Sequence, residues 1–436
     1  MTNKSFEPGY LVALDEIYHS HWAARKRHRI EILREAVTYF WPDGHPAKLL
    51  HITGTNGKGS VAHYLEQGLR FAGNTGSWTG PHVFDYAERF HINGEIASHK
   101  DIVSIYRNKL IPYQQSRGAT PVGKDRGTTP AGESLSFAEL GILITLHLFE
   151  KYNVAWGIME VGAGGRYTPL MALNMAACLL TNVGADHPKT LGTELWQRAL
   201  EKAGIARKEA PFFTSAVDPA LSYVRKTAEA EGAEVYAVHQ RDITEIKTVM
   251  GEQPEFKLRN MALAVKLIRH FHPEFDFKQS IPGMTGSLTA RFKKAADNIL
   301  VDVSHNADKI GKLAEQLNFT YPGRKFRFII GLTRSRDARD VFAPLIQLAN
   351  HIVVTGASYA GQDPHEIAEI LKNDFGKIEV IPEPEKAFII EKERLKKDEI
   401  LVLTGSAYMI DQALNSNPYI RHLNATYGRR GPDGNL

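Results

Sequence analysis

Residues 49–60, LLHITGTNGKGS, decide how this chain folds. Leu49 to Ile52 form an apolar run that predicts a buried strand, and apolar residues recur at helical spacing after Ser60. A strand, a glycine-rich turn and a helix make the setting of a phosphate-binding loop, because backbone N–H groups and the helix N-terminus attract an anion. Lys58 would then reach the outer phosphates of a nucleotide, and Ser60 would place its hydroxyl on Mg²⁺.

The spacing of this loop differs from the common G-x-x-x-x-G-K-[ST] pattern, because Gly59 separates Lys58 from Ser60. The flanking strand and helix nevertheless favour nucleotide binding over a purely structural turn. We therefore predict nucleotide contacts from seven consecutive residues: Gly54, Thr55, Asn56, Gly57, Lys58, Gly59 and Ser60.

The composition is that of a globular protein, with 43% hydrophobic and 23% charged residues. A length of 436 residues predicts two or three domains. The net charge of +4 permits small anionic substrates and does not argue for nucleic acid. Cys178 is the single cysteine, and neither a signal peptide nor a membrane span is evident. We expect a cytoplasmic monomer with no nucleic-acid or membrane partner.

Strands and helices alternate along the chain, which predicts an α/β fold with a parallel sheet. A composition shift over residues 281–290 predicts an interdomain linker. We expect a P-loop ATPase domain with a mostly parallel sheet over residues 1–285, and a second, C-terminal Rossmann-like α/β domain over residues 286–436. A hairpin is expected around Asn93-Gly94. The strands expected after the first one are 155–161, 176–183, 299–303, 326–330, 352–354, 378–381 and 400–403.

Three segments lie outside this alternation. The basic run at residues 25–29 has two open interpretations, a solvated helix face or a contact with an anionic substrate. Residues 117–134 are rich in Gly, Pro, Ser and Thr and are expected to form a mobile loop, and the tail at residues 427–434 is expected to be disordered.

Three titratable residues are candidates for chemistry. Glu160 ends an apolar strand, and that position favours a metal ligand over a carboxylate facing water. His187 follows Asp186 after another apolar strand, so a metal ligand and a turn cap are both open. The pattern around Lys202 alone indicates a surface lysine.

The order of these motifs resembles the folylpolyglutamate synthase and dihydrofolate synthase family of the Mur ligase superfamily. The matching segments extend from Gly54 to Ser406 and so cover most of the chain. They are TGTNGKGS at 53–60, EVGAGGR at 160–166, DH at 186–187, EKAGI at 201–205, NMALA at 260–264, DVSHN at 302–306 and TGS at 404–406.

The resemblance implies an ATP-dependent amide ligase, with ATP and Mg²⁺ as cofactors. An acceptor carboxylate would attack the γ-phosphate, and the amine of an amino acid, usually glutamate, would displace phosphate from the acyl phosphate. The first domain would bind ATP, and the second would bind the amino acid. The implied catalytic residues are Lys58, His187 and Lys202. The implied metal ligands are Ser60, Glu160, His187 and a carbamylated Lys202; the further nucleotide contacts are Asn260, Arg291 and Asp302; and the amino-acid contacts are His305 and Ser406.

The chain departs from the family pattern on the acceptor side. Gly80 stands where the family has a serine that helps to bind metal, and Thr168 and Leu170 stand where it has aspartate and threonine. A pocket lined by Leu170 and Met171 would suit an apolar or aromatic body, so we expect dihydropteroate and tetrahydrofolate to be poor substrates. The alternative is that Asp85 or Arg89 replaces the lost contacts.

Three functional hypotheses follow. The first is a folylpolyglutamate or dihydrofolate synthase. The second is a Mur-type ligase of the same chemistry that acts on another carboxylate. The third is a nucleotide-binding regulator that has lost ligation, and the presence of Lys58, Glu160, His187 and Lys202 argues against it.

Overall fold

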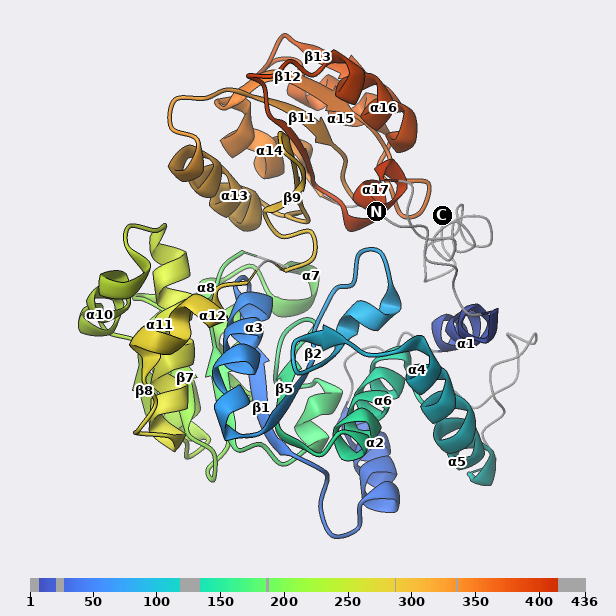
Figure 1. Cartoon of the computed structure of the whole chain (residues 1–436), viewed down its shortest axis with the longest axis vertical. Coiled ribbons are helices and arrows are strands. Elements are labelled where there is room, and N and C mark those ends of the chain that lie inside the picture. The colour runs from blue at the N-terminus through green and yellow to red at the C-terminus, as the bar shows by residue number, and fades with distance from the viewer. Residues whose placement is uncertain are drawn as a thin grey trace. The chain divides into compact units, whose positions relative to one another are not determined.

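A computed structural model describes residues 8–20, 27–117, 134–185, 188–286, 288–334 and 336–414. The chain divides into two compact units, and Figure 1 labels many of their elements. Unit 1 comprises residues 1–81 and 86–285, and unit 2 comprises residues 82–85 and 286–436.

Unit 1 is built on an eight-stranded sheet of order β4-β3-β2-β5-β1-β6-β7-β8. Its strands are β1 (Lys48–Thr53), β2 (Asn74–Trp78), β3 (Phe90–Ile92), β4 (Glu95–Ile96), β5 (Val154–Glu160), β6 (Ala177–Leu180), β7 (Phe212–Thr214) and β8 (Val235–Ala237). Neighbouring strands pair in parallel along the run β2-β5-β1-β6-β7-β8. Strand β3 pairs antiparallel with both β2 and β4. Strand β1 lies between β5 and β6, so the carboxyl ends of these three strands meet at one edge of the sheet.

Helices cover this sheet. They are α1 (Pro8–His19), α2 (Arg27–Phe40), α3 (Lys58–Gly68), α4 (His99–Ile105), α5 (Ile111–Ser116), α6 (Phe137–Lys151), α7 (Pro188–Leu191), α8 (Leu195–Ala203), α9 (Ala220–Ala230), α10 (Gln240–Met250), α11 (Glu255–Phe271) and α12 (Phe277–Met284). Four shorter helical turns are η1 (Arg70–Ala72), η2 (Tyr86–Arg89), η3 (Tyr106–Leu110) and η4 (Pro169–Ala172).

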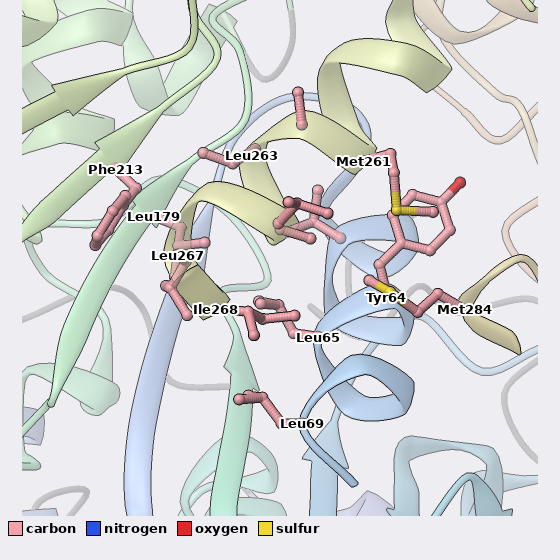
Figure 2. Packing of buried hydrophobic residues seen from close by; sticks show 14 of the residues in the cluster. Tyr64, Leu65, Leu69, Leu179, Phe213, Met261, Leu263, Leu267, Ile268 and Met284 are labelled. Atoms are coloured by element: carbon pink, nitrogen blue, oxygen red, sulfur yellow. The ribbon is translucent and has the colours of Figure 1, made fainter. Parts of the chain in front are cut away.

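The core of unit 1 anchors α3, the helix that follows the glycine-rich turn. Leu65 of α3 and Leu69, which follows the helix, are fully buried in one cluster with Leu267 and Ile268 of α11 (Figure 2). Burying one such side chain contributes about 1.5–3 kcal/mol. Gly68 lets α3 and α11 approach closely, because a Cβ there would lie 2.6 Å from the Cδ1 atom of Ile268. The packing therefore fixes where the N-terminus of α3 lies relative to β1.

Unit 2 is built on a six-stranded sheet of order β13-β12-β11-β14-β10-β9. Its strands are β9 (Lys293–Ala296), β10 (Ile299–Asp302), β11 (Phe326–Ile330), β12 (Ala349–Val354), β13 (Ile378–Val380) and β14 (Leu401–Thr404). Its helices are α13 (Ala307–Thr320), α14 (Ala338–Ile346), α15 (Pro364–Leu371), α16 (Pro384–Arg394) and α17 (Ala407–Ala413). All neighbouring strands pair in parallel except β9, which pairs antiparallel with β10.

The predicted fold class is confirmed, with a mostly parallel sheet in unit 1 and a second α/β sheet in unit 2. The hairpin predicted around Asn93-Gly94 is also present, as β3 and β4. The linker prediction is wrong for residues 281–284, because α12 continues to Met284 and buries Ile281 and Met284 in the core of unit 1. The division between the units falls between Thr285 and Gly286.

The basic run at residues 25–29 is described only in part, and its last residue is not on a solvated face. Arg29 is 3% exposed, and its Nε donates to Oε1 of Glu139 over 2.8 Å. Glu139 is fully buried and also accepts the backbone N–H of Ser136 over 2.8 Å at the start of α6. The solvated-face interpretation is therefore wrong for Arg29, which ties α2 to α6.

Two further expectations fall outside what the structure describes. The loop predicted at residues 117–134 lies almost entirely outside the described residues, and so does the tail at residues 427–434. Among the helices that are described, none combines the length and the apolar character needed to cross a bilayer.

Candidate active site

The turn between β1 and α3 requires glycine at two positions. Gly54 has a φ of 144° and Gly57 a φ of 81°, which are conformations that other residues rarely adopt. A Cβ on Gly54 would lie 1.9 Å from Oγ1 of Thr181, and a Cβ on Gly57 would lie 2.7 Å from the side-chain amide of Asn260. The loop is thus packed tightly against the segment after β6 and against α11.

The N-terminus of α3 is suited to an anion. Gly57 is its N-cap residue, and no side chain in the described part of the chain caps the helix. The first N–H groups of a helix have no partner within the helix, and the helix dipole adds positive potential at the same point. The helix therefore presents donors at the carboxyl end of β1, which is where a phosphate would bind.

Lys58 folds back over the loop. Its Nζ donates to the carbonyl oxygen of Gly54 over 2.9 Å and to that of Thr55 over 3.4 Å. The same Nζ lies 3.9 Å from Oε1 of Glu160, the last residue of β5. The Lys58 side chain is 12% exposed and that of Glu160 is 4% exposed. A mostly buried cation thus lies beside a buried carboxylate without a close hydrogen bond between them.

The segment after β6 fixes the conformation of the loop. Oδ1 of Asn182 accepts the N–H of Asn56 over 2.8 Å, and its carbonyl oxygen accepts the N–H of Thr55 over 3.1 Å. Thr181 donates its hydroxyl to the carbonyl oxygen of Asn56, and the N–H of Gly184 donates to Oγ1 of Thr55 over 2.9 Å. Sequence reasoning missed Thr181 and Asn182. Their position directly after the strand that neighbours β1 is the signal that could have found them.

The side chain of Asn56 is suited to contact a polar ligand. Both Oδ1 and Nδ2 of Asn56 are buried, and neither has a hydrogen-bond partner among the described residues. Buried polar atoms are almost always paired in native proteins. A bound nucleotide or ion would supply the partner that the protein does not.

Two of the predicted metal ligands, Glu160 and Ser60, offer the oxygen atoms that Mg²⁺ prefers. Glu160 accepts the N–H of Gly80 with Oε2 over 3.1 Å, which leaves its remaining lone pairs available. Ser60 is half-buried in the first turn of α3. Hydroxyl and carboxylate oxygens are hard ligands that suit this ion. His187 lies outside the described residues, so the structure does not place this predicted ligand.

Lys202 is not the surface lysine that its local pattern indicates. It lies on α8 and is 2% exposed. Burying an ammonium group is costly unless other groups compensate for the lost water. Its burial is the feature that separates Lys202 from an ordinary lysine on a helix face.

The second-unit residues predicted as ligand contacts gather at the carboxyl ends of β10 and β14. Both oxygens of Asp302 accept backbone N–H groups, from Phe292 and from Ser304, each over 2.8 Å. Ser406 is 1% exposed and caps α17 by accepting the N–H of Met409. Arg291 lies at the turn before β9, where its N–H donates to the carbonyl oxygen of Leu288. Direct ligand contact by any of them stays a prediction.

His305 has a defined tautomer in this arrangement. Its Nε2 lies 3.1 Å from Nζ of Lys309, and its Nδ1 lies 2.7 Å from the carbonyl oxygen of Val303. An ammonium group can only donate, so Nε2 accepts and the ring proton sits on Nδ1. These two contacts hold the ring of His305 between β10 and α13.

The comparisons with known proteins agree with this geometry. Residues 290–407 match the family model described as Mur ligase, glutamate ligase domain. The dihydrofolate synthase/folylpolyglutamate synthase of Bacillus subtilis is 23% identical over 403 residues, which cover 84% of this chain and 90% of that protein. A probable bifunctional folylpolyglutamate synthase/dihydropteroate synthase of Haloferax volcanii is 24% identical over 416 residues, covering 88% of this chain and only 48% of that protein. Thus the chain spans about half the length of this relative.

A solved structure shows the same fold. The bifunctional folylpolyglutamate synthase/dihydrofolate synthase of Yersinia pestis, complexed with AMPPNP and Mn ion, superposes with a TM-score of 0.74 at 21% identity. The match covers 98% of this chain and all of the other. In sequence and in fold the chain is similar to folylpolyglutamate synthases and dihydrofolate synthases. The two relatives and the solved structure named above are all described as synthases.

The acceptor-side departures from this family lie mainly in the core. Thr168 is 6% exposed and donates its hydroxyl to the carbonyl oxygen of Gly165 over 3.0 Å. Leu170 is 1% exposed. The expectation that Leu170 lines an open acceptor pocket is therefore wrong, because its side chain is packed inside unit 1. Met171 does line a hollow of about 420 Å³, together with Arg166 and Tyr167.

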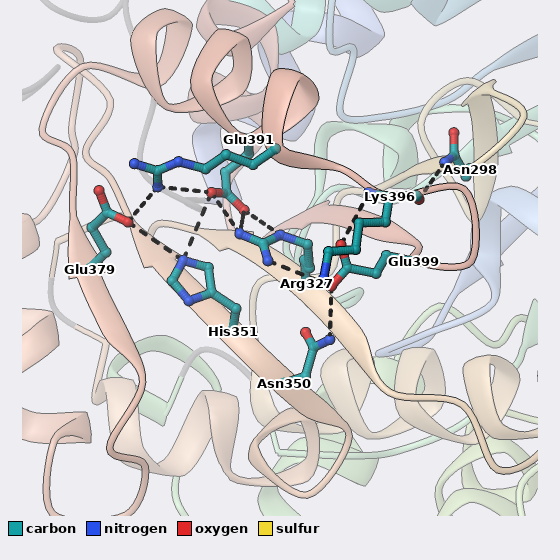
Figure 3. Close-up of polar contacts among 9 residues, drawn as sticks. Asn298, Arg327, Asn350, His351, Glu379, Glu391, Lys396 and Glu399 are labelled. Carbon is teal, nitrogen blue, oxygen red and sulfur yellow. Dashed lines mark hydrogen bonds and ion pairs between the residues drawn. The ribbon is translucent and has the colours of Figure 1, made fainter.

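A second charged cluster, in unit 2, resembles a metal site in composition. Ligand atoms of His351, Glu379 and Glu391 all lie within 4.8 Å of one another (Figure 3). Glu391 is fully buried, but Arg327 binds both of its oxygens, over 2.8 and 3.0 Å. Arg394 binds Glu379 over 2.7 Å. Two guanidinium groups already neutralise these carboxylates, so the cluster is a structural network.

Proposed function

We propose that this ligase binds ATP at the loop of residues 54–60 and uses it to activate a carboxylate. The single observation that supports this most strongly is the uncapped N-terminus of α3 beside the Lys58–Glu160 pair. Lys58 and the α3 donors would hold the β- and γ-phosphates. They would offset the charge of the phosphoryl group as the acceptor carboxylate attacks it.

The proposed reaction has two steps, phosphorylation of the acceptor carboxylate by ATP and then attack by the amino acid. One oxygen of the acceptor carboxylate forms a bond to the γ-phosphorus, the bond from that phosphorus to the bridging oxygen breaks, and ADP leaves with the electron pair. The amine of the amino acid then adds to the acyl carbon, and phosphate leaves with the electron pair of the carbon–oxygen bond. The amine loses its proton in this step, and an amide remains.

We propose Mg²⁺ as the metal, held by Ser60 and Glu160, with His187 and Lys202 as further candidates. When bound, the ion would add positive charge beside the phosphates. The solved Yersinia relative was complexed with Mn ion and a nucleotide analogue, which supports a divalent ion at the matching place here. Within the chain itself, Glu160 orients the site by accepting the N–H of Gly80.

We propose that Lys202 carries a carbamate in the active enzyme. Carbamylation converts an ammonium group into an anion, which would place another oxygen ligand near the metal site. Burial supports this proposal. Lys202 is 2% exposed, so water stabilises its ammonium group very little, and the neutral amine that reacts with carbon dioxide is favoured.

We propose that unit 2 binds the incoming amino acid and that this amino acid is glutamate. The match of residues 290–407 to a glutamate ligase domain supports the choice. His305 and Ser406 are the candidate contacts, and Arg291 and Asp302 are candidate nucleotide contacts from the same unit. Asn260, which lies against Gly57, would support the phosphate loop from unit 1.

We propose a folate-type acceptor, dihydropteroate or a reduced folate, as the names of the relatives suggest. A carboxylate other than folate is the second candidate, and Thr168 favours it. Its hydroxyl already donates to Gly165, and it stands where the family has a carboxylate. Asp85 and Arg89 are the residues that could compensate for the lost carboxylate.

We further propose that the protein is a cytoplasmic monomer without nucleic-acid or membrane partners. Gel filtration tests its oligomeric state.

Phosphate release from ATP tests the proposal. The assay is run with each combination of dihydropteroate, tetrahydrofolate and unrelated carboxylates with glutamate and other amino acids. Release that needs both an acceptor and an amino acid supports ligation. Micromolar KM values with ordinary turnover for either folate would establish the folate acceptor. Phosphate release that occurs with another carboxylate and an amino acid, but with neither folate, would establish the second candidate. A protein that releases no phosphate with any pair would contradict the proposed function.

A further inference from the structure

Gly80 connects the phosphate site to a neighbouring loop. Its N–H donates to Oε2 of Glu160 over 3.1 Å, and Oε1 of the same carboxylate lies 3.9 Å from Nζ of Lys58. The backbone at residue 80 is therefore one hydrogen bond away from the carboxylate beside the catalytic lysine. Gly80 has no side chain, so the space beside its Cα is open to a neighbour.

The guanidinium group of Arg89 fills that space. A Cβ built on Gly80 would lie 2.8 Å from Nη1 and 3.5 Å from Cζ of Arg89. The backbone holds Arg89 in this position, because its carbonyl oxygen accepts the N–H of Thr79 over 3.0 Å where β2 and β3 pair. Cζ of Arg89 also lies 5.2 Å from the centre of the Phe137 ring. The residue is half-buried, which limits the water around its charge.

We propose that Arg89 is a catalytic residue whose guanidinium contacts the phosphoryl group as it passes from ATP to the acceptor carboxylate. This inference rests on the proposed function. Lys58 and Arg89 would then flank Glu160 and act on the phosphoryl group from two sides. The absence of a side chain at residue 80 is what admits the guanidinium to this place.

The reaction explains why a second cation is useful. A carboxylate and a triphosphate are both anions, and they must approach within bonding distance. The carboxylate oxygen forms the new bond to phosphorus while ADP leaves with the electron pair, and no proton moves. A guanidinium remains charged throughout and has planar donors that match the oxygens of a phosphoryl group. Charge placed in advance where negative charge concentrates lowers the barrier.

A purely structural role for Arg89 makes different predictions. Its contact with the Phe137 ring could simply hold η2 and β3 in place. Arg107 offers a matched control, because its Cζ lies 5.4 Å from the Tyr106 ring and its Nη1 pairs with Glu16 over 2.7 Å. Arg107 lies on η3, and no interaction connects it to the phosphate loop among the described contacts. Loss of Arg107 therefore removes the same kind of packing without touching the site.

The test compares Arg89→Ala with Arg107→Ala in steady-state ligation. We expect kcat to fall about 10²–10³-fold in Arg89→Ala, with KM for ATP changed less than about threefold, as for loss of one preorganised charge in the transition state. Arg107→Ala is expected to keep the wild-type kcat. Guanidinium chloride added at millimolar concentration should restore part of the activity of Arg89→Ala and none of the activity lost in Lys58→Ala.

If Arg89→Ala fails to fold, the variant Gly80→Ala tests the same proposal. The added methyl group would displace the guanidinium, and kcat should fall about tenfold or more while ATP affinity stays near wild type. The proposal is overturned if kcat of folded Arg89→Ala is within twofold of Arg107→Ala, or if Gly80→Ala has wild-type kcat. A wild type that forms no ADP would instead overturn the proposed function. An active wild type with an inactive Lys58→Ala and an active Arg89→Ala would overturn this inference alone.

Discussion

The Lys58–Glu160 pair of unit 1 and the Arg327–Glu391 pair of unit 2 are both largely buried, and they are built differently. Nζ of Lys58 stays 3.9 Å from its carboxylate, whereas Arg327 makes two hydrogen bonds of 2.8 and 3.0 Å to Glu391. The first pair lies at the carboxyl end of β5. The second lies near the beginning of β11.

The surroundings of the two pairs differ in the same way. Arg327 and His351 lie around Glu391 (Figure 3), and Nη1 of Arg394 lies 3.4 Å from Oε1 of the same carboxylate. Near Lys58, by contrast, the side-chain amide of Asn56 has no hydrogen-bond partner among the described residues, and none of their side chains caps α3. A saturated network stabilises a fold, and an unsaturated one is open to a ligand. The comparison therefore separates a structural ion pair from a candidate active site.

The largest expected effect concerns Lys202, for which we propose a carbamate in the open site of unit 1. We expect Lys202→Ala to lower kcat by about 10³-fold or more, as for loss of a charge that stabilises the transition state. Added formate or acetate should restore part of the activity. Mass spectrometry of the intact wild type in bicarbonate should show the added mass of one carbon dioxide. A fully active alanine variant, with no added mass in the wild type, would contradict the role.

The second prediction concerns stability and tests the structural cluster. Arg327→Met leaves Glu391 buried with less compensation and should destabilise unit 2 by about 3–5 kcal/mol. All five tryptophans precede residue 197, so tryptophan fluorescence follows unit 1 while far-UV circular dichroism follows both units. We expect urea unfolding to shift in the dichroism and ATP affinity to stay unchanged. An unshifted dichroism transition would show that the network is not what holds unit 2.

Asn182 provides a smaller effect on the open site. Asn182→Ala removes the acceptor for the N–H of Asn56 and should weaken ATP binding about tenfold, which corresponds to about 1.4 kcal/mol. Asn74→Ala is the control, because it also removes a hydrogen bond between an asparagine side chain and the backbone, here from Nδ2 of Asn74 on β2 to the carbonyl oxygen of Tyr152. Isothermal titration with ATP and Mg²⁺ measures both. Equal affinities in the two variants would show that the loop holds its shape without Asn182.

The smallest effect is a pH dependence inside the core of unit 1. His51 is fully buried, neither ring nitrogen has a partner among the described residues, and burial, followed by the nearby Arg207, sets its pKa well below 6.5. The unfolded chain therefore binds a proton below pH 6.5 that the folded chain does not, so stability is lost as pH falls. The expected loss is about 1.4 kcal/mol per pH unit below that point.

His51→Leu should remove this part of the pH dependence. We compare urea midpoints by tryptophan fluorescence at pH 7.5 and pH 5.5 for both proteins. His63 and His91, whose pKa values are also lowered by burial, will leave some slope in each. A wild type and a His51→Leu variant with the same slope would show that His51 does not titrate on unfolding.

The phosphate loop was predictable because its signals are local. Strand, glycines, lysine and helix follow one another within residues 49–60, and no distant residue is needed to see them. The end of β5 was also readable to within one residue, whereas β6 ends at Leu180, three residues before the predicted end of that strand at residue 183. The class of fold followed from the alternation of these elements.

What the sequence did not reveal depends on distant contacts. The burial of Lys202, the hydrogen bonds of Asn182 and the position of Arg89 against Gly80 all arise when separate segments pack together. Strand β9 escaped prediction because Lys293 to Ala296 are mostly exposed, with no apolar alternation. Leu170 was assigned to a pocket because an apolar residue in a functional motif looks the same whether it faces a ligand or the core.

Titration of the wild type and of Lys58→Ala with ATP and Mg²⁺ in a calorimeter tests the central claim most directly. Lys48→Ala is the control, because Lys48 begins the same strand at the opposite end, with Nζ 5.5 Å from the Trp156 ring centre. The account predicts one ATP per wild-type chain, the same for Lys48→Ala, and affinity weakened by about a hundredfold or more for Lys58→Ala at an unchanged melting temperature. Wild-type affinity in folded Lys58→Ala would contradict it.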